Sequence, residues 1–221
     1  MRVSLRVLLV DDDALVRTGL SMILGSTPDI EVVAEAGDGD EAVRQVTQFN
    51  PDVVIMDIRM RRMNGLAATA AVAALPRAPK VLILTTFDLD EYVYEALAAG
   101  ASGFLLKEGS PKEIIEAVRV VAAGEAMLSP RTTKKLIGEF VATRSNPRRT
   151  RALAQLDLLS VREREIVTAV AQGKPNADIA GDLFLSEATV KTHITRTFAK
   201  LDVSNRVQLT IFAYESGLVR P

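Results

Sequence analysis

Carboxylates follow two apolar runs of the sequence, each at the point where a β-strand would end. Asp11–Asp13 come directly after Val7–Val10, and Asp57 comes directly after Val53–Met56. Because the carboxyl ends of parallel strands meet at one edge of a sheet, we expect these side chains to lie close together. Clustered carboxylates repel one another and raise one another's pKa, so the pattern indicates a bound cation that prefers oxygen ligands, most simply Mg2+.

Two other polar residues are predicted at the same edge of the sheet. Thr85 follows Val81–Leu84, and Lys107 follows Phe104–Leu106. An aspartate nucleophile, an acid pair that holds a cation, a hydroxyl and an ammonium together make a phosphoryl-transfer site. In such a site Asp57 would attack phosphorus, Thr85 would donate to a phosphoryl oxygen, and Lys107 would neutralise charge. Each residue alone is also typical of an ordinary turn, but the whole set favours phosphate chemistry.

The elements that would position these residues alternate between strands and helices. Short runs rich in Val, Ile and Leu are typical of strands buried on both faces, and helix-period segments fill the gaps between them. The last helix is predicted at Pro111–Ala123, with Ser110 as its N-cap. We therefore expect an α/β domain with a doubly wound, five-stranded parallel sheet. The predicted strands are Arg6–Val10, Ile30–Ala36, Val53–Met56, Lys80–Leu84 and Gly103–Leu106.

Composition excludes several kinds of site. The 221 residues include no cysteine and a single histidine, His193, which excludes disulfides, thiol catalysis, Cys-ligated zinc and multi-His metal sites. The segment Gly37–Gly39 predicts a turn, because no third glycine completes a dinucleotide-binding fingerprint. The first apolar run is too short for a signal peptide or a membrane span, so we expect a cytoplasmic protein without membrane partners.

Charge is distributed unevenly along the chain, although the net charge is only −1. Residues 1–130 carry 12 Lys and Arg against 19 Asp and Glu, residues 131–155 carry 7 against 1, and residues 156–221 carry 8 against 8. The tail of the basic segment, at residues 143–151, lacks apolar periodicity. We interpret this segment as a solvated connector between two domains, with help in holding nucleic acid as the alternative.

The C-terminal segment has a helical pattern throughout. Ser160–Glu163 predicts a capping box at the start of a first helix. Two helices joined by a short turn, the second of them long, are typical of a helix-turn-helix. The later helices are predicted at Asn176–Leu183, at Glu187–Leu201 with Ser186 as its cap, and from about Asn205 to Glu215.

The predicted helix at Glu187–Leu201 has two different faces. One is an apolar stripe at helical spacing that should pack on the rest of the domain. The other alternates small residues with hydrogen-bond donors, a pattern that lets a helix enter the major groove of DNA. For this helix alone, a solvated polar face is an equally simple interpretation, because the domain is not net basic. The stripe consists of Val190, Ile194, Thr197, Phe198 and Leu201.

Residues 1–125 resemble the receiver domain of two-component response regulators in the order and spacing of their polar residues. The resemblance implies that Asp57 is the phosphoacceptor, that two acids hold Mg2+ beside it, and that a backbone carbonyl also binds the ion. It further implies a set of switch residues. The implied metal site is Asp11, Asp12, Asp57 and the carbonyl of Arg59, and the implied switch residues are Thr85, Phe104 and Lys107.

The resemblance is incomplete in the loop after Asp57. Arg61 stands where the family usually carries proline, which stiffens that loop, so the rigidity of the loop is left open.

A rival resemblance also exists, because Asp11–Leu15 is similar to the opening motif of haloacid-dehalogenase-type phosphohydrolases. Those enzymes place a further acid pair after their lysine, and the residues that follow Lys107 include no such pair at a strand end. The sequence therefore disfavours the interpretation of this chain as a phosphohydrolase of that type.

Residues 156–219 resemble the LuxR-type helix-turn-helix of the NarL/FixJ class, most closely over Leu185–His193. Pro175 departs from the Ser or Thr that is usual at its position. The resemblance implies that Val207, Leu209 and their neighbours form a dimer contact. It also implies base contacts by Lys191, Thr192 and Thr195, and phosphate contacts by Thr189, Arg196 and Lys200.

Together the two resemblances imply a phosphorylation-controlled, DNA-binding transcriptional regulator rather than an enzyme. We expect a receiver domain at residues 1–125, a basic linker at 126–155 and a DNA-binding domain at 156–221. A sensor histidine kinase would phosphorylate Asp57 with the help of Mg2+, and the protein would then act as a homodimer on double-stranded DNA. The alternative is a regulator whose receiver is not phosphorylated and which binds DNA constitutively or in response to a small molecule.

Overall fold

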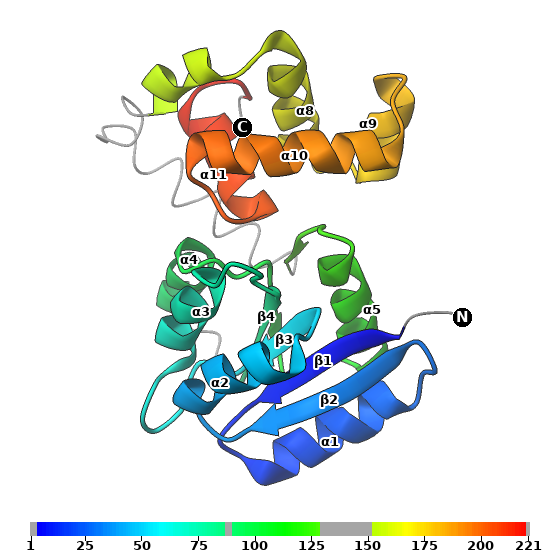
Figure 1. Ribbon diagram of the computed structural model, residues 1–221, viewed down its shortest axis with the longest axis vertical. Coiled ribbons are helices and arrows are strands. Elements are labelled where there is room, and N and C mark those ends of the chain that lie inside the picture. The colour runs from blue at the N-terminus through cyan, green and yellow to red at the C-terminus, as the bar shows by residue number, and fades with distance from the viewer. Residues whose placement is uncertain (1–3, 87–89, 129–151, 220–221) are drawn as a thin grey trace. The chain divides into compact units, whose positions relative to one another are not determined.

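The computed structural model describes residues 4–86, 90–128 and 152–219 (Figure 1). The chain divides into two compact units, Met1–Thr132 and Thr133–Pro221. The tail of the predicted linker, at residues 143–151, lies outside the described residues. In the parts of the chain that are described, no helix is both long enough and apolar enough to cross a membrane.

The N-terminal unit is built on a parallel sheet with the strand order β2-β1-β3-β4-β5-β6. The five predicted strands are confirmed. The short strand β6 extends the sheet beyond β5, and its two residues are too few to show a periodicity in the sequence. The strands are β1 Leu5–Val10, β2 Ile30–Ala36, β3 Val53–Met56, β4 Lys80–Thr85, β5 Gly103–Leu106 and β6 Met127–Leu128.

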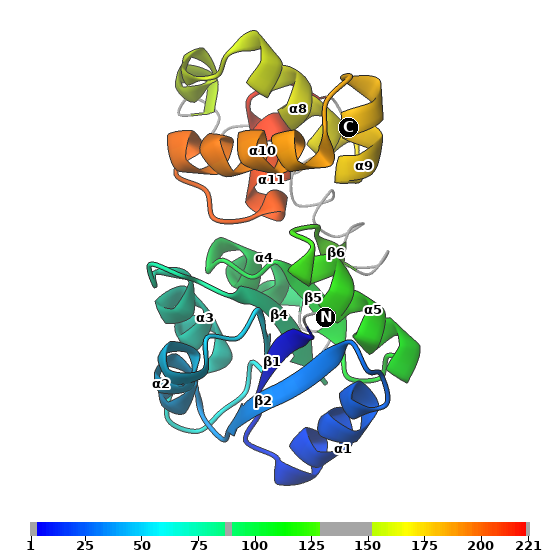
Figure 2. The ribbon, with the colours of Figure 1, turned by 45° about the vertical axis from the view of Figure 1, so that its right-hand side comes forward.

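Helices cover both faces of this sheet, with α1 and α5 on one face and α2, α3 and α4 on the other (Figures 1 and 2). Leu24 of α1 and Val118 of α5 pack with Leu9 and Ile55 of the sheet in one core. Ser110 caps α5 in a capping box with Glu113. The helices are α1 Ala14–Gly25, α2 Gly39–Phe49, α3 Gly65–Ala73, α4 Asp90–Ala98 and α5 Pro111–Ala122.

The C-terminal unit is helical and has a core of its own. The predicted capping box at Ser160 is present, and the Ser186 side chain accepts the Thr189 N–H as the N-cap of α10. The apolar stripe of α10 faces the core as predicted, with Val190 fully buried. The described elements are η1 Leu156–Leu158, α8 Val161–Ala171, α9 Asn176–Asp182, α10 Glu187–Leu201 and α11 Arg206–Glu215.

The expected dimer contact on α11 is wrong for the two residues named for it. Leu209 is fully buried in the core of its own unit, and Val207 is only 5% exposed. Helix α11 packs directly against α8. A side chain that already fills the core of its own domain cannot also contact a second copy, so these two residues stabilise the unit itself.

Candidate functional site

The ends of β1 and β3 bring three carboxylates together. Asp11, Asp12 and Asp57 each place a carboxylate oxygen within 4.8 Å of the other two. Asp11 and Asp57 are buried, whereas Asp12 is exposed. The Asp57 N–H donates to the Val10 carbonyl at 2.8 Å and so ties the end of β3 to β1. Asp13 has a different task, because its carboxylate caps the N-terminus of α1.

Lys107, which follows β5, reaches the same group of acids. Its Nζ forms an ion pair with Asp11 and lies 3.1 Å from Oδ1 of Asp57. Burial would lower the pKa of Lys107, but the two carboxylates outweigh burial and raise that pKa. Burial also raises the pKa of Asp57, and the Lys107 ammonium opposes this rise. Lys107 therefore stays charged and neutralises part of the acidic cluster.

Thr85 and Phe104 lie on the two strands nearest to Lys107. Thr85 ends β4 and is buried, and its carbonyl accepts the Lys107 N–H at 2.8 Å. Phe104 is buried in β5, paired in register with Ile83 of β4. The Arg59 N–H donates to Oδ2 of Asp57 at 2.9 Å. The role expected for the Arg59 carbonyl stays a prediction.

The loop after Asp57 is held by Asp38, which the sequence placed only in a turn. The Asp38 carboxylate accepts the backbone N–H groups of Arg62 and Met63, both at 2.9 Å. Burial would raise the pKa of Asp38, but these donors lower it to about 2. Asp38 stands just after β2, so the strand-end rule that selected the other acids would have found it. These bonds fix the loop that lacks the usual proline at Arg61.

Two arginines also border the acidic cluster. Arg17 of α1 donates from Nη1 to the Asp11 carbonyl at 2.6 Å and pairs with Glu35 at 3.1 Å, which holds the end of β1 in place. Arg61 lies with Nε 3.8 Å from Oδ2 of Asp12 and is 90% exposed. An ion pair this open to solvent contributes little to stability. Arg61 thus adds positive charge beside Asp12 without covering the acidic cluster.

Helix α10 presents a polar outer face. Lys191, Thr192, Thr195 and Arg196 are exposed, and Thr189 is half-buried. The hydroxyls of Thr192 and Thr195 donate to carbonyls one helical turn earlier, at 2.9 and 3.0 Å. Each hydroxyl keeps acceptor lone pairs for a ligand. The side chains predicted to read bases are therefore accessible on one helix.

Comparison with known proteins decides the family. Residues 7–119 match the response regulator receiver domain, and residues 157–213 match the luxR family of bacterial regulatory proteins. The uncharacterized transcriptional regulatory protein YxjL of Bacillus subtilis strain 168 is 41% identical over 217 residues, which covers 98% of both chains. The chain is a response regulator of the NarL/FixJ class.

Two further proteins are similar to this response regulator over nearly its whole length. The transcriptional regulatory protein LiaR of the same Bacillus strain is 40% identical and covers 97% of this chain and 99% of its own. The crystal structure of the response regulator ChrA, from a heme-sensing two-component system, is 38% identical, with a TM-score of 0.53. It covers 98% of this chain and 99% of its own. The response regulator is thus a DNA-binding transcription regulator of two-component signalling.

Lys200 of the response regulator has a partner inside the protein. Its Nζ lies 2.7 Å from Oε2 of Glu163, whose side chain is 6% exposed. Burial would raise the pKa of Glu163, but Lys200 and the groups of Ser160 lower it to about 2. The ion pair joins the C-terminal end of α10 to the first turn of α8. This contact gives Lys200 a structural role in addition to its predicted phosphate contact.

We expect the stability of the C-terminal unit to fall as the pH drops through the range between the two pKa values of Glu163. That pKa is lowered from 4.5 to about 2 by folding, so the stabilisation is complete above 4.5 and is lost towards 2. Lys200→Ala should lower the free energy of unfolding by about 1–3 kcal/mol near neutral pH. It should also flatten the acid limb, which is the fall in the free energy of unfolding as the pH drops below 4.5. Urea unfolding at several pH values measures both effects.

Lys191→Ala is the matched control for Lys200→Ala. Lys191 is an exposed lysine of the same helix, and its Nζ lies 3.2 Å from the exposed Glu187. Such a surface pair contributes about 0–1 kcal/mol, so this variant should keep the acid limb of the wild type. An acid limb that is equally steep in wild type and Lys200→Ala would contradict the role of the ion pair.

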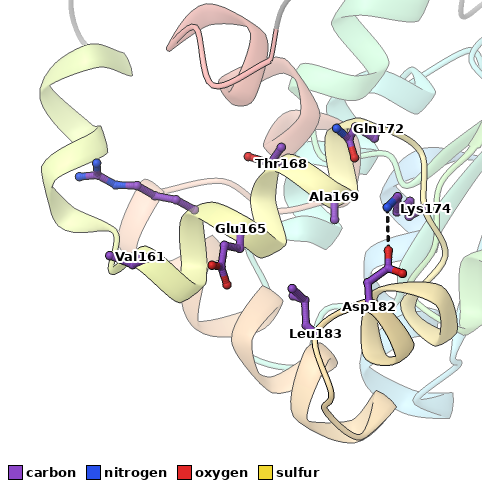
Figure 3. A pocket seen from close by; sticks show the side chains of 9 residues that line it. Val161, Glu165, Thr168, Ala169, Gln172, Lys174, Asp182 and Leu183 are labelled. Carbon is purple, nitrogen blue, oxygen red and sulfur yellow. Dashed lines mark hydrogen bonds and ion pairs between the residues drawn. The ribbon is translucent and has the colours of Figure 1, made fainter.

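A hollow of about 530 Å³ lies on the surface of α8 and the end of α9 (Figure 3). Thr168 of α8 and Gln172, the residue that follows α8, line it, and the ion pair between Lys174 and Asp182, at 2.7 Å, crosses one side of it. Its lining includes none of the residues predicted to contact DNA. The hollow therefore belongs to a surface other than the polar face of α10.

Proposed function

We propose that phosphorylation of Asp57 switches this response regulator and thereby controls its dimerisation and its binding to double-stranded DNA. The proposal rests above all on the convergence of three carboxylates with Lys107 at the carboxyl ends of β1, β3 and β5. A buried ion pair needs one acid for each base. Even with the exposed Arg61 beside Asp12, the three carboxylates outnumber the nearby cations, which indicates a site that binds a metal ion and a phosphoryl group.

The acidic cluster fits Mg2+. Receiver domains bind this ion at a cluster of aspartates, and carboxylate oxygen is the donor that the ion prefers. Three carboxylates facing the Lys107 ammonium and the exposed Arg61 guanidinium leave an excess of negative charge that a divalent cation would offset. When bound, the ion would shield the phosphoryl oxygens, so that an anionic nucleophile can approach phosphorus. The proposed ligands are Asp11, Asp12, Asp57 and the Arg59 carbonyl.

The chain's own residues would carry the transfer from the phosphohistidine of a sensor kinase. An oxygen of Asp57 attacks phosphorus in line, the phosphorus–nitrogen bond to the donor histidine breaks, and an aspartyl phosphate forms. Lys107, now 3.1 Å from Asp57, pairs with a phosphoryl oxygen, and the Thr85 hydroxyl donates to another. A shift of Thr85 then changes the packing of Phe104, which carries the signal to the receiver surface.

The rest of the chain would convert this signal into DNA binding. We propose a receiver at residues 1–125, a basic linker at 126–155 and a DNA-binding domain at 156–221, which agrees with family matches at residues 7–119 and 157–213. Dimers would bind two half-sites about one helical turn apart. On α10, the proposed base contacts are Lys191, Thr192 and Thr195, and the proposed phosphate contacts are Thr189, Arg196 and Lys200.

Treatment of the full-length protein with acetyl phosphate and Mg2+ tests the proposed function. We expect native mass spectrometry to show phosphorylated dimers in place of unphosphorylated monomers. The affinity for a duplex selected by the protein from a random-sequence pool should rise at the same time. Tight binding that is equal before and after phosphorylation would instead support a constitutive regulator.

Lys191→Ala should weaken binding to the selected duplex by roughly 1–3 kcal/mol and relax base discrimination, because Lys191 lies near the N-terminal end of α10. Arg196→Ala is the comparison, since Arg196 lies further along the helix. Its loss should weaken binding to all sequences alike and lower the salt slope by about one phosphate contact. Titrations against selected and random duplexes at several salt concentrations measure both. If Lys191→Ala lost the same factor on both duplexes, Lys191 would not be a base reader.

A further inference from the structure

A phenylalanine in the turn between α9 and α10 occupies a position that does not favour stability. Phe184 is 95% exposed, and its φ angle is 54°, in the left-handed region. A side chain with a Cβ is strained in that region, and an exposed aromatic ring gains nothing from burial. The presence of a phenylalanine at such a position therefore calls for an explanation.

The backbone explains the left-handed conformation but not the choice of phenylalanine. The Leu185 N–H donates to the Ala180 carbonyl at 2.9 Å, and the Phe184 N–H donates to the Gly181 carbonyl at 3.3 Å. These bonds close the end of α9 in the way that usually places Gly or Asn at the left-handed residue. The neighbouring Leu183 and Leu185 pack against the core. The ring of Phe184 therefore points away from the core and contributes nothing to it.

The place of Phe184 in the chain indicates what its ring contacts. Phe184 stands two residues before Ser186, the N-cap of α10, which puts it within about 7 Å of that helix end along the chain. In helix-turn-helix proteins the N-terminal end of the second helix enters the major groove. The edge of that groove offers apolar partners to a ring, namely deoxyribose carbons and thymine methyl groups.

We propose that Phe184 is part of the DNA-binding surface and packs its ring on the apolar groups of DNA at the edge of the major groove. This inference rests on the proposed function, because it takes α10 as the helix that enters the groove. It assigns to DNA binding the choice of phenylalanine, rather than glycine, at this left-handed position. Glycine in place of Phe184 would relieve the backbone strain, but it would also remove the proposed contact between the ring and DNA.

Phe184→Gly in the full-length protein tests this proposal through two readouts that should move in opposite directions. Glycine adopts the left-handed conformation without strain, so the thermal unfolding midpoint of the C-terminal unit should rise by several degrees. The affinity for the duplex selected with the wild type should fall about tenfold, because the apolar contact is lost. Phe184→Tyr keeps the ring and should bind like the wild type. A rise in stability excludes misfolding as the cause of weaker binding.

Val161→Ser is the matched control, because Val161 is another exposed apolar residue, 77% exposed, at the first position of α8. It should bind DNA like the wild type. Wild-type affinity in Phe184→Gly would overturn the proposal. Loss of phosphorylated dimers with unchanged DNA affinity would assign the ring to a second copy and would overturn it too. Failure of the wild type itself to bind any duplex would refute the proposed function. That outcome differs from wild-type affinity in Phe184→Gly, which would refute only the role of Phe184.

Discussion

Asp57→Ala should abolish phosphorylation. With Mg2+ and acetyl phosphate the wild type should gain an acid-labile phosphoryl group, whereas the variant should gain none, because alanine offers no oxygen to attack phosphorus. Asp57, like Asp11, is buried in the carboxylate cluster beside the Lys107 ammonium, which lies 3.1 Å from Oδ1 of Asp57, and the receiver-domain resemblance selects Asp57 as the acceptor. Intact mass spectrometry before and after mild acid treatment measures the group and its lability.

The control for this experiment is Asp13→Ser. Asp13 is next to the acidic cluster in sequence, but its carboxylate caps α1, and serine can cap a helix equally well. This variant should therefore keep both its fold and the phosphoryl gain of the wild type. The same mass gain in Asp57→Ala as in Asp13→Ser would show that another residue is the phosphoacceptor.

Gly65→Ala should be strongly destabilising. A Cβ at Gly65 would lie 1.9 Å from the carbonyl oxygen and 2.8 Å from the carbonyl carbon of Asp57. Backbone atoms cannot move aside as a flexible side chain can, and the Gly65 N–H is itself held by the Ile58 carbonyl at 2.8 Å. We expect the free energy of unfolding of the receiver to fall by about 3 kcal/mol or more, with phosphorylation lost as the Asp57 loop shifts.

Gly19→Ala makes the same chemical change where there is room for it. Gly19 lies inside α1, and apart from its chain neighbours and the adjacent backbone of its own helix, no described atom comes within 4 Å of a Cβ added there. Alanine favours helix over glycine, so this variant should gain about 0.5–1 kcal/mol of stability. Urea unfolding of both variants measures the contrast. Equal stability of Gly65→Ala and the wild type would mean that the loop can open without cost.

Local patterns account for the parts of the fold that could be predicted. Apolar runs marked β1, β3, β4 and β5, because a strand buried on both faces leaves little room for polar residues, whereas the edge strand β2 keeps Glu31 and Glu35 exposed. The N-cap at Ser110 and the capping box at Ser160 join residues only three positions apart, so they could be predicted from the sequence. The meeting of Asp11 and Asp57 followed from a general rule, since parallel strands place their carboxyl ends at one edge.

The sequence alone therefore determined the two fold types, the acidic cluster and the face of α10 that meets the core. Only the tertiary structure decided those long-range contacts that the strand-end rule does not cover. Asp38 binds the backbone of Arg62, 24 residues later, and Glu163 pairs with Lys200, 37 residues later. The family resemblance implied that Leu209 contacts a second copy, but packing decided that Leu209 fills the core of its own unit, where α11 packs against α8. Polarity and spacing belong to a segment, whereas a contact belongs to two segments that the fold brings together.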